Sequence, residues 1–223
     1  MRVKKKLWAV IPARSGSKGF PDKNIAEFEG QPLLVHSIRF AQNLSFVDKI
    51  LVSTDSDKYA HIAKNAGADV PFLRSDWASN DSSMEQDVLE DIRVQCIENN
   101  ITPPDSILWL RPTHPHRSIA KFEKMNEMFL TGLYDSVVAV TKEDSRLFVL
   151  NANGILGHAT EKNYFQKQSM QRRQDIEPYF RMYHGEIFHF PISYDPCFLG
   201  TKIGAMILPD DCKKDIDYAR DLQ

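Results

Sequence analysis

Short apolar runs alternate with helical patterns from Leu7 to Leu130, and a further run follows. This order limits the possible folds more than any other feature of the chain. Short runs rich in Val, Ile and Leu are typical of parallel strands that are covered on both faces. We therefore predict an α/β fold with a doubly wound, mostly parallel sheet. The expected strands are Leu7–Ile11, Lys49–Ser53, Ser106–Leu110 and Ser136–Val140. The expected helices are Pro32–Asn43, Asp57–Asn65, Met84–Ile97 and Ile119–Leu130.

Several helix ends carry their own signals. The segment Ser82-Ser83-Met84-Glu85 matches a capping box, in which the serine oxygen and the glutamate carboxylate bind free backbone N–H groups. Gly67 and Gly132 follow the second and fourth helical patterns, where a left-handed residue ends a helix.

The pattern changes after Val140. Residues 141–180 are polar and irregular, and Asn151–Gly154 is typical of a hairpin turn. A long excursion of this kind usually has a function or contacts a partner. Strand-like runs return at Glu186–Phe190 and Lys202–Leu208, and the chain ends in a loop and a short helix. We predict a single domain over residues 1–223, with 141–180 as the excursion.

Composition excludes several classes of protein. The chain has 223 residues, 42% apolar and 26% charged, with a net charge of −2. This charge does not favour binding to nucleic acid or to a membrane surface. No apolar stretch is long enough to span a bilayer, and the start does not resemble a signal peptide, so we expect a cytoplasmic protein. The three cysteines are widely spaced, which argues against a zinc site or a disulfide framework.

The loop after the first strand has the composition of a phosphate-binding loop. Glycine lets the backbone turn its N–H groups toward an anion, and basic side chains add positive charge. An arginine can also form a two-pronged contact with phosphate oxygens. Walker A spacing is absent. The loop residues concerned are Arg14, Ser15, Gly16, Ser17, Lys18, Gly19, Lys23 and Asn24.

Asp215-Ile216-Asp217 is a candidate metal site. On extended backbone, residues two apart point to the same side, so both carboxylates can converge. Carboxylates beside a polyphosphate suit Mg²⁺, which prefers oxygen ligands. The same pattern also occurs as a simple helix cap.

Two more segments carry candidate binding groups. Arg111–Arg117 follows the third strand directly, at the carboxyl edge of the sheet, and includes Thr113, His114 and His116. We consider metal binding by the two histidines unfavourable, because no carboxylate is close in sequence. Gln171–Asp175 is a basic cluster in the irregular region, and taken alone it is equally typical of a solvated turn.

Taken together and in order, these motifs resemble those of the acylneuraminate cytidylyltransferases, which include enzymes for sialic, legionaminic and pseudaminic acid. The resemblance spans nearly the whole chain. It rests on Ile11–Asn24, Ile50–Asp55, Val70–Arg74, Pro112–Arg117, Arg173-Gln174 and Asp215–Asp217. It implies a Rossmann-like domain, CTP and Mg²⁺, and a homodimer whose arm, within residues 141–180, reaches the neighbouring active site.

The resemblance also assigns roles to residues. Arg14, Ser17, Lys18 and Asn24 match the nucleotide-binding loop, and Arg74 matches an arginine that closes on the nucleotide. Ser82 or Ser83 matches a serine that contacts CTP, and we select Ser83. Arg173 and Gln174 match the segment where sugar acid and partner subunit meet. Asp215 and Asp217 match the metal-binding pair.

Two positions depart from the family pattern. Arg111 replaces the usual glutamine before Pro-Thr, and His184 replaces the usual asparagine before glycine. Both lie where the sugar acid is expected, so they bear on the acceptor more than on the reaction.

The implied reaction is attack by the anomeric hydroxyl of a nonulosonic acid on the α-phosphorus of CTP, releasing pyrophosphate. Arg14 and Lys18 would stabilise the leaving group, and Asp217 would hold the metal or orient or deprotonate the hydroxyl. Arg111, Arg117 and Arg173, with Thr113 and Gln174 nearby, are candidates for binding the acid. The alternatives are a nucleotidyltransferase with another nucleotide and sugar, or a catalytically silent nucleotide-binding homologue.

Overall fold

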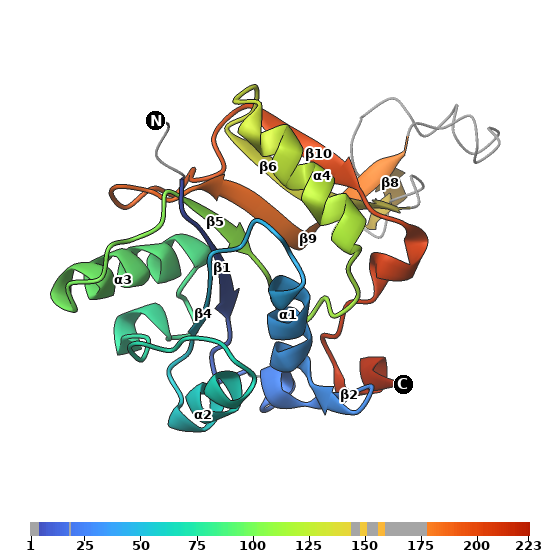
Figure 1. The fold of residues 1–223 in the computed structure, drawn as a ribbon. Helices are drawn as coiled ribbons and strands as arrows, with labels where there is room; N and C mark the ends of the chain where they lie inside the picture. The colour runs from blue at the N-terminus through green and yellow to red at the C-terminus, as the bar shows by residue number, and fades with distance from the viewer. Residues whose placement is uncertain (1–4, 18, 144–147, 151–155, 159–177) are drawn as a thin grey trace.

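A six-stranded mixed sheet forms the centre of the molecule (Figure 1). The computed structural model describes residues 5–17, 19–143, 148–150, 156–158 and 178–223. The strand order is β10-β6-β9-β5-β1-β4. Only β9 runs antiparallel to its neighbours, between β5 and β6. The strands are β1 Leu7–Pro12, β4 Lys49–Ser53, β5 Ser106–Trp109, β6 Ser136–Glu143, β9 Tyr179–His189 and β10 Ile203–Ile207.

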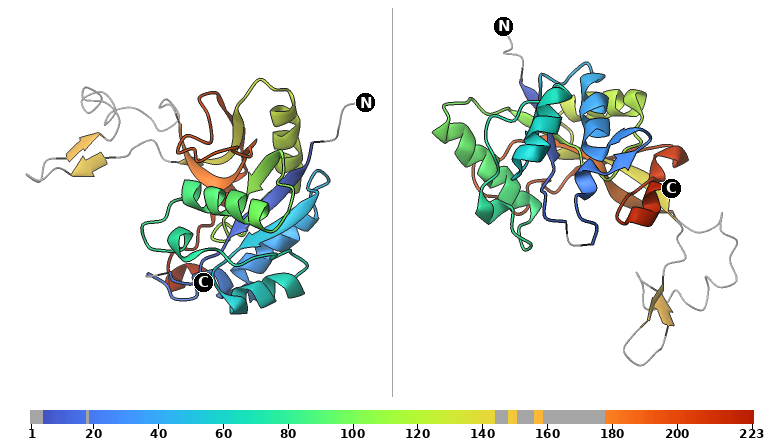
Figure 2. Two further views of the ribbon diagram at one scale, coloured as in Figure 1. Left: turned by 90° about the vertical axis from the view of Figure 1, so that its left-hand side faces the viewer. Right: turned by 90° about the horizontal axis from the view of Figure 1, so that it is seen from below.

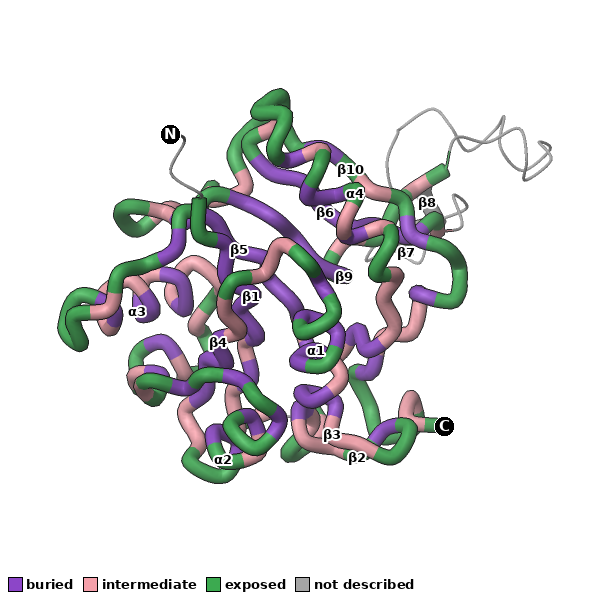
Figure 3. Tube along the Cα trace, in the orientation of Figure 1, coloured by how far each residue is buried: buried purple, intermediate pink, exposed green. Residues whose placement is uncertain are grey.

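Helices cover both faces of this sheet, as the apolar strands predict. The helices are α1 Leu33–Gln42, α2 Asp57–Asn65, α3 Glu85–Glu98 and α4 Ile119–Leu130. Leu7, Ala9 and Ile11 of β1 belong to the core that contains residues of α1, α2 and α4. Trp8 and Val10, which alternate with them, belong to the core beneath α3. Figure 3 shows the buried strands between these layers. The prediction of a doubly wound, mostly parallel sheet is confirmed.

The expected elements agree closely with the observed ones, and two of the helices and one strand match residue for residue. Gly67 and Gly132 have φ values of +90° and +70°, as expected for helix-ending glycines. The capping box at Ser82–Glu85 is wrong. The Met84 N–H donates to Asp87 Oδ2 at 2.7 Å, and Met84 is the N-cap, so α3 begins two residues later than that box requires. The serine hydroxyls bond elsewhere in the preceding loop, to Asn80 and Trp77.

The smaller elements lie outside the central sheet. Strands β2 Glu27–Phe28 and β3 Gln31–Pro32 form one hairpin, and β7 Phe148–Leu150 pairs antiparallel with β8 Leu156–His158. The β7–β8 pair lies apart from the central sheet in both views of Figure 2. The expected turn Asn151–Gly154 falls between these strands but lies outside the described residues. Short 3₁₀ turns occupy Lys23–Ile25, Asp76–Ala78, Asp210–Lys213 and Ala219–Leu222.

Strand β9 differs most from its expected range, since it begins seven residues before Glu186. Its pairing with β6 is interrupted by a bulge near Tyr183, whose φ is +84°. In the described part of the chain, no helix has the length and apolar character needed to cross a membrane.

Candidate active site

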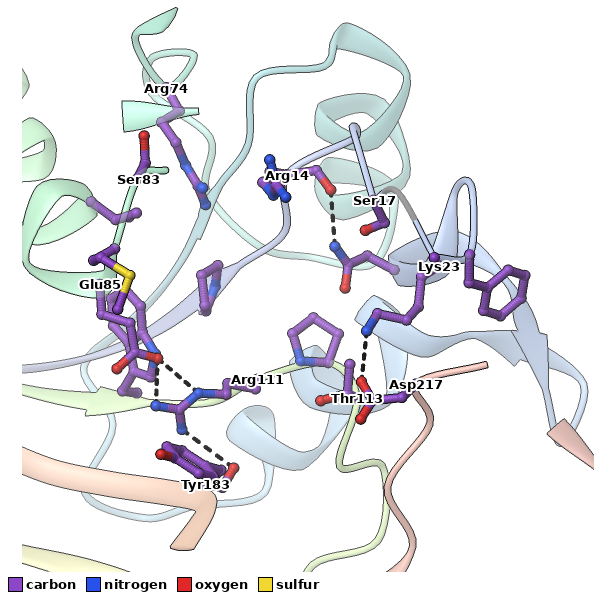
Figure 4. A pocket seen from close by; sticks show the side chains of 18 of the residues that line it. Arg14, Ser17, Lys23, Arg74, Ser83, Glu85, Arg111, Thr113, Tyr183 and Asp217 are labelled. Carbon is purple, nitrogen blue, oxygen red and sulfur yellow. Dashed lines mark hydrogen bonds and ion pairs between the residues drawn. The ribbon is translucent and has the colours of Figure 1, made fainter. Parts of the chain in front are cut away.

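A pocket of about 860 Å³ opens beyond the carboxyl ends of β1 and β5 (Figure 4). Ligands in open α/β sheets bind at this edge. The pocket wall brings together residues from both ends of the chain. The candidates from the sequence that line it are Arg14, Ser17, Asn24, Arg74, Ser83, Arg111, Thr113 and Asp217. Lys18, Arg173 and Gln174 lie outside the described residues.

The loop after β1 is held in shape by its own side-chain bonds. Asp55, two residues after the end of β4, accepts bonds from the Ser15 N–H at 2.8 Å and the Ser15 hydroxyl at 3.0 Å. The buried Asn24 amide donates to the Arg14 carbonyl at 3.0 Å. These bonds hold the backbone of the loop at Arg14 and Ser15 and tie it to Asn24.

The two loop glycines border open space. A Cβ atom added to Gly16 or Gly19 would meet no heavy atom within 4 Å. Close approach by a ligand is therefore sterically possible along this backbone, which is what a phosphate-binding loop requires. Arg14 lies at the same edge, with its Nη1 3.1 Å from Asp81 and 3.3 Å from the Ser79 carbonyl.

Lys23 and Asp217 form an ion pair on the wall of the pocket. The Lys23 ammonium lies 2.9 Å from Asp217 Oδ1, and both residues line the cavity. Lys23 was noted in the sequence as part of the basic loop but was not assigned a contact. The structure makes it the direct link between that loop and the aspartate pair.

Arg74 is buried and firmly anchored. Its Nε donates to the Ser53 hydroxyl at 2.9 Å and its Nη2 to the Ser53 carbonyl at 2.6 Å. Burial lowers the pKa of the guanidinium to about 10, so it keeps its charge at neutral pH. Ser83 lies on the same side of the pocket, and its hydroxyl donates to the Trp77 carbonyl.

Ile216 positions the two aspartates beside it. Its side chain is fully buried against Phe28 and Leu33, and its N–H donates to the Thr113 carbonyl at 2.9 Å. Because neighbouring residues on extended backbone point to opposite sides, the carboxylates of Asp215 and Asp217 point away from the core that Ile216 enters. Burial and the nearby Asp217 carboxylate raise the pKa of Asp215, while Arg181 offsets part of that effect from 3.4 Å.

The donor set of these aspartates fits a magnesium ion. Mg²⁺ is commonly held by one or two carboxylates together with substrate phosphates, so a complete cage of protein ligands is not required. In the residues described, no group of three or more His, Cys, Asp or Glu side chains could hold a metal alone. The pair therefore suits an ion that arrives with a polyphosphate.

Arg111 is engaged by two glutamates that the sequence analysis did not single out. Its Nε donates to Glu85 at 2.8 Å, and its Nη2 bonds the same carboxylate. Its Nη1 donates to both oxygens of the buried Glu186, at 2.7 and 2.8 Å. All three guanidinium nitrogens thus already bond carboxylates. This arrangement does not fit the expectation that Arg111 binds the carboxylate of the sugar acid.

Arg117 is a buried structural residue and does not line the pocket. It donates to the His184 carbonyl at 2.8 Å, the Ser37 hydroxyl at 3.1 Å and the Arg111 carbonyl at 2.6 Å. Burial lowers its pKa to about 9. With every nitrogen bonded inside the fold, Arg117 holds the loop after β5 and does not fit the expected role as a ligand of the acid.

Two histidines of this region pack in the interior, whereas His116 is partly exposed and lies 3.0 Å from Glu29. His114 and His184 contact each other edge to face, with ring centroids 4.7 Å apart. Burial lowers the pKa of His184 to about 4 and that of His114 to about 2, so both rings are neutral at physiological pH. His114 Nε2 lies 3.7 Å from Asp215 Oδ1, which puts it beside the aspartate pair rather than on the pocket wall.

Glu85, Glu186 and Tyr183 were missed by the sequence analysis. An acidic residue in an apolar strand, as in Gly185-Glu186-Ile187-Phe188, was a signal for Glu186, because buried carboxylates are usually paired. Glu85 was instead assigned to a capping box. No local pattern identifies Tyr183, since its position depends on the bulge in β9.

The chain is similar to known cytidylyltransferases. The family model for cytidylyltransferases matches residues 8–222. The pseudaminic acid cytidylyltransferase of Campylobacter jejuni serotype O:2 is 28% identical over 96% of this chain and 92% of its own. The CMP-N,N'-diacetyllegionaminic acid synthase of Legionella pneumophila is 40% identical over 50% of this chain and 48% of its own. The N-acylneuraminate cytidylyltransferase of Streptococcus agalactiae serotype V is 31% identical over 77% of this chain and 40% of its own.

Solved structures share the fold. A CMP:2-keto-3-deoxy-manno-octonic acid synthetase complexed with CTP superposes with a TM-score of 0.64, at 15% identity and over 96% of this chain and 94% of its own. A 4-diphosphocytidyl-2C-methyl-D-erythritol synthase gives a TM-score of 0.67, at 13% identity and over 99% of this chain and 96% of its own.

Proposed function

This chain belongs to the cytidylyltransferase family, and we propose that it transfers CMP from CTP to the anomeric hydroxyl of a nonulosonic acid. The observation that carries the proposal is the pocket in which the basic loop after β1 faces Asp217. One wall offers cations and N–H groups to a triphosphate, and the other offers the Asp217 carboxylate, with Asp215 next to it but not on the pocket wall. The acceptor class is supported by relatives named for pseudaminic, legionaminic and acylneuraminic acid.

The nucleotide would lie along the wall formed by the loop after β1 and Arg74. Arg14, Ser17 and Asn24 line the pocket here, and Ser83 lines it on the side of Arg74. Arg14 and Lys18 would neutralise charge on the leaving pyrophosphate. Because phosphoryl chemistry depends mainly on positioning and charge stabilisation, these contacts supply most of what the reaction needs.

Asp215 and Asp217 would hold Mg²⁺ against the phosphates of CTP. When bound, the ion would polarise the phosphoryl oxygens and neutralise part of their charge. Lys23, which bonds Asp217 in the structure, would then be free to contact a phosphate oxygen. In this exchange the magnesium ion would replace Lys23 beside Asp217, and Lys23 would move beside a phosphate oxygen.

The chemical step forms one bond and breaks another. The anomeric oxygen attacks the α-phosphorus, and the bond from that phosphorus to the oxygen leading to the β-phosphorus breaks. The hydroxyl proton leaves, and pyrophosphate is released with the electron pair. Asp217 lines the pocket and has an exposed carboxylate, so orienting or deprotonating the hydroxyl is a second role consistent with its place.

The sugar acid would be bound by the described pocket wall and by residues of the segment 141–180. Thr113 lines the pocket, while Arg173 and Gln174, outside the described residues, stay the proposed contacts for the carboxylate. We further propose that the segment within 141–180 serves as the arm of a homodimer and reaches the neighbouring pocket.

A pyrophosphate-release assay tests the proposal directly. Purified protein is supplied with each of CTP, UTP, GTP and ATP, and with sialic, legionaminic, pseudaminic or 3-deoxy-manno-octulosonic acid, with and without Mg²⁺. The expected result is Mg²⁺-dependent turnover with CTP and at least one of the first three acids. Turnover with another nucleotide would favour a different nucleotidyltransferase. Nucleotide binding without turnover would identify a catalytically silent homologue.

A further inference from the structure

Tyr183 has a backbone conformation that tyrosine rarely adopts. Its φ of +84° lies in the left-handed region, where a bulky side chain is strained. Strained residues of this kind persist only where the surroundings hold them, and they gather at functional sites. Tyr183 also lines the pocket, and about half of its surface is exposed.

A bulge in β9 produces this conformation. Ala139 of β6 pairs with Gly185, whereas Thr141 pairs with Arg181. The pairing therefore advances two residues along β6 and four along β9. Bulges commonly occur beside active sites, where they redirect a side chain. Here the extra residues turn the ring of Tyr183 toward the cavity wall shared with Arg111.

Arg111 holds Tyr183 in place. The Arg111 guanidinium carbon lies 4.7 Å from the centroid of the Tyr183 ring, and its Nη1 donates to the Tyr183 carbonyl at 3.3 Å. Glu85 and Glu186 fix the guanidinium from the other sides. The planar fork is thus oriented by two carboxylates and presents its face to the aromatic ring.

The position of the ring points to the acceptor rather than the nucleotide. In Figure 4, Tyr183 and Arg111 lie at the end of the pocket opposite Arg74 and Ser83, the side assigned to the nucleotide. Binding of a phosphate is disfavoured there, because the two carboxylates of Glu85 and Glu186 outweigh the single positive charge of Arg111. The same negative charge disfavours the carboxylate of the sugar acid. An uncharged part of the acceptor, such as an acyl or deoxy carbon, suits the exposed tyrosine ring.

We infer that Tyr183 is a specificity-determining residue that contacts the uncharged substituents of the acceptor acid, and that Arg111 is its positioning residue. This inference rests on the proposed function. It also gives the departure at position 111 a role: an arginine there orients Tyr183 and leaves the carboxylate of the acid to other residues.

Tyr183→Gly provides the sharpest test. Glycine adopts the observed φ without strain, so the melting temperature should stay the same or rise. Loss of the ring should nevertheless raise the KM for the acid by about fivefold or more, while the KM for CTP stays within about twofold. Tyr183→Phe keeps the ring and removes the hydroxyl, so it shows which of the two groups contributes to the KM for the acid. Tyr194→Ala, a half-exposed tyrosine that does not line the pocket, is the matched control.

The role of Arg111 is tested by a double-mutant cycle. Arg111→Lys keeps the charge but loses the planar fork, and it should raise the KM for the acid. If Arg111 acts through Tyr183, adding Arg111→Lys to Tyr183→Gly should have little further effect. Fully additive effects would refute the positioning role.

The outcomes separate this inference from the proposed function. An unchanged KM for the acid in Tyr183→Gly, or a rise in the KM for CTP instead, overturns the inference while wild-type turnover upholds the function. Absence of turnover by the wild type with every acid overturns both.

Discussion

The ammonium of Lys23 lies 2.9 Å from the carboxylate of Asp217, although 194 positions separate the two residues in the chain. This contact closes the pocket between the loop after β1 and the segment that follows β10. Opposite charges meet there, where the proposed triphosphate and magnesium ion would bind.

Replacing Lys23 with methionine should weaken CTP binding. The substitution removes a phosphate partner and leaves the shape of the side chain similar. We expect the KM for CTP to rise several-fold and to depend less on ionic strength, because one charge interaction is lost. Steady-state kinetics at two salt concentrations measure both effects. Lys58→Met is the control, since Lys58 forms an exposed ion pair with Asp22 and does not line the pocket. An unchanged KM would remove Lys23 from the nucleotide site.

Asp217→Ala should abolish Mg²⁺-dependent turnover while the protein stays folded. The carboxylate is exposed and contributes little to the core, so the melting temperature should change only slightly. Pyrophosphate release is followed during a Mg²⁺ titration, with thermal unfolding measured in parallel. Asp210→Ala, an exposed aspartate in a surface ion pair, should retain normal activity. Near-normal turnover in Asp217→Ala would exclude the metal assignment.

Gly185→Ala should destabilise the fold without touching the pocket lining. A Cβ atom there would lie 2.7 Å from the Phe122 ring and 3.2 Å from Leu110. Overpacking of this kind costs about 1–3 kcal/mol of the free energy of unfolding. Urea unfolding measures the loss. Gly16→Ala, which meets no atom within 4 Å, should leave stability nearly unchanged. Equal effects at the two positions would argue against tight packing at Gly185.

The buried His184 should make stability depend on pH. Burial holds its pKa near 4 in the folded protein, against 6.5 for an ordinary histidine. The unfolded chain therefore binds a proton first as the pH falls. This contribution to stability is complete above pH 6.5 and is lost progressively toward pH 4. His184→Asn should flatten the decline, as measured by urea unfolding across that range. An identical pH profile in the variant would contradict the prediction, and the exposed His61→Asn serves as control.

Most of the fold could be predicted from the sequence because its signals are local. The strand Lys49–Ser53 and the helices Asp57–Asn65 and Ile119–Leu130 have the expected bounds, since each element carries its own apolar period and end signals. The capping box at α3 was wrong because Asp87 accepts the bond from the Met84 N–H, while the Ser82 and Ser83 hydroxyls bond Asn80 and Trp77 in the preceding loop. The choice among such caps depends on the preceding loop and not on spacing alone.

In the candidate site, too, some residues could be recognised from local sequence and others could not. The loop after β1 and the Asp-Ile-Asp segment are contiguous motifs, so their chemistry could be recognised before their positions were known. Arg111 and Arg117 could not be distinguished, because both are arginines of one loop. Their roles depend on partners far along the chain, namely Glu186 for the first and the His184 carbonyl for the second.

The sequence by itself determined the doubly wound sheet, and it identified the loop after β1 and the aspartate pair as candidates, because periodicity and short motifs encode these features locally. Only the tertiary structure decided that Lys23 meets Asp217, that two glutamates occupy Arg111, and that a bulge turns Tyr183 into the pocket. The contacts of Arg111 with Glu186 and Tyr183 arise where β9 inserts antiparallel between β5 and β6, and the contact of Lys23 with Asp217 arises where the segment after β10 returns to the loop after β1. Strand pairing across long sequence separations sets which side chains become neighbours, and no local pattern contains that information.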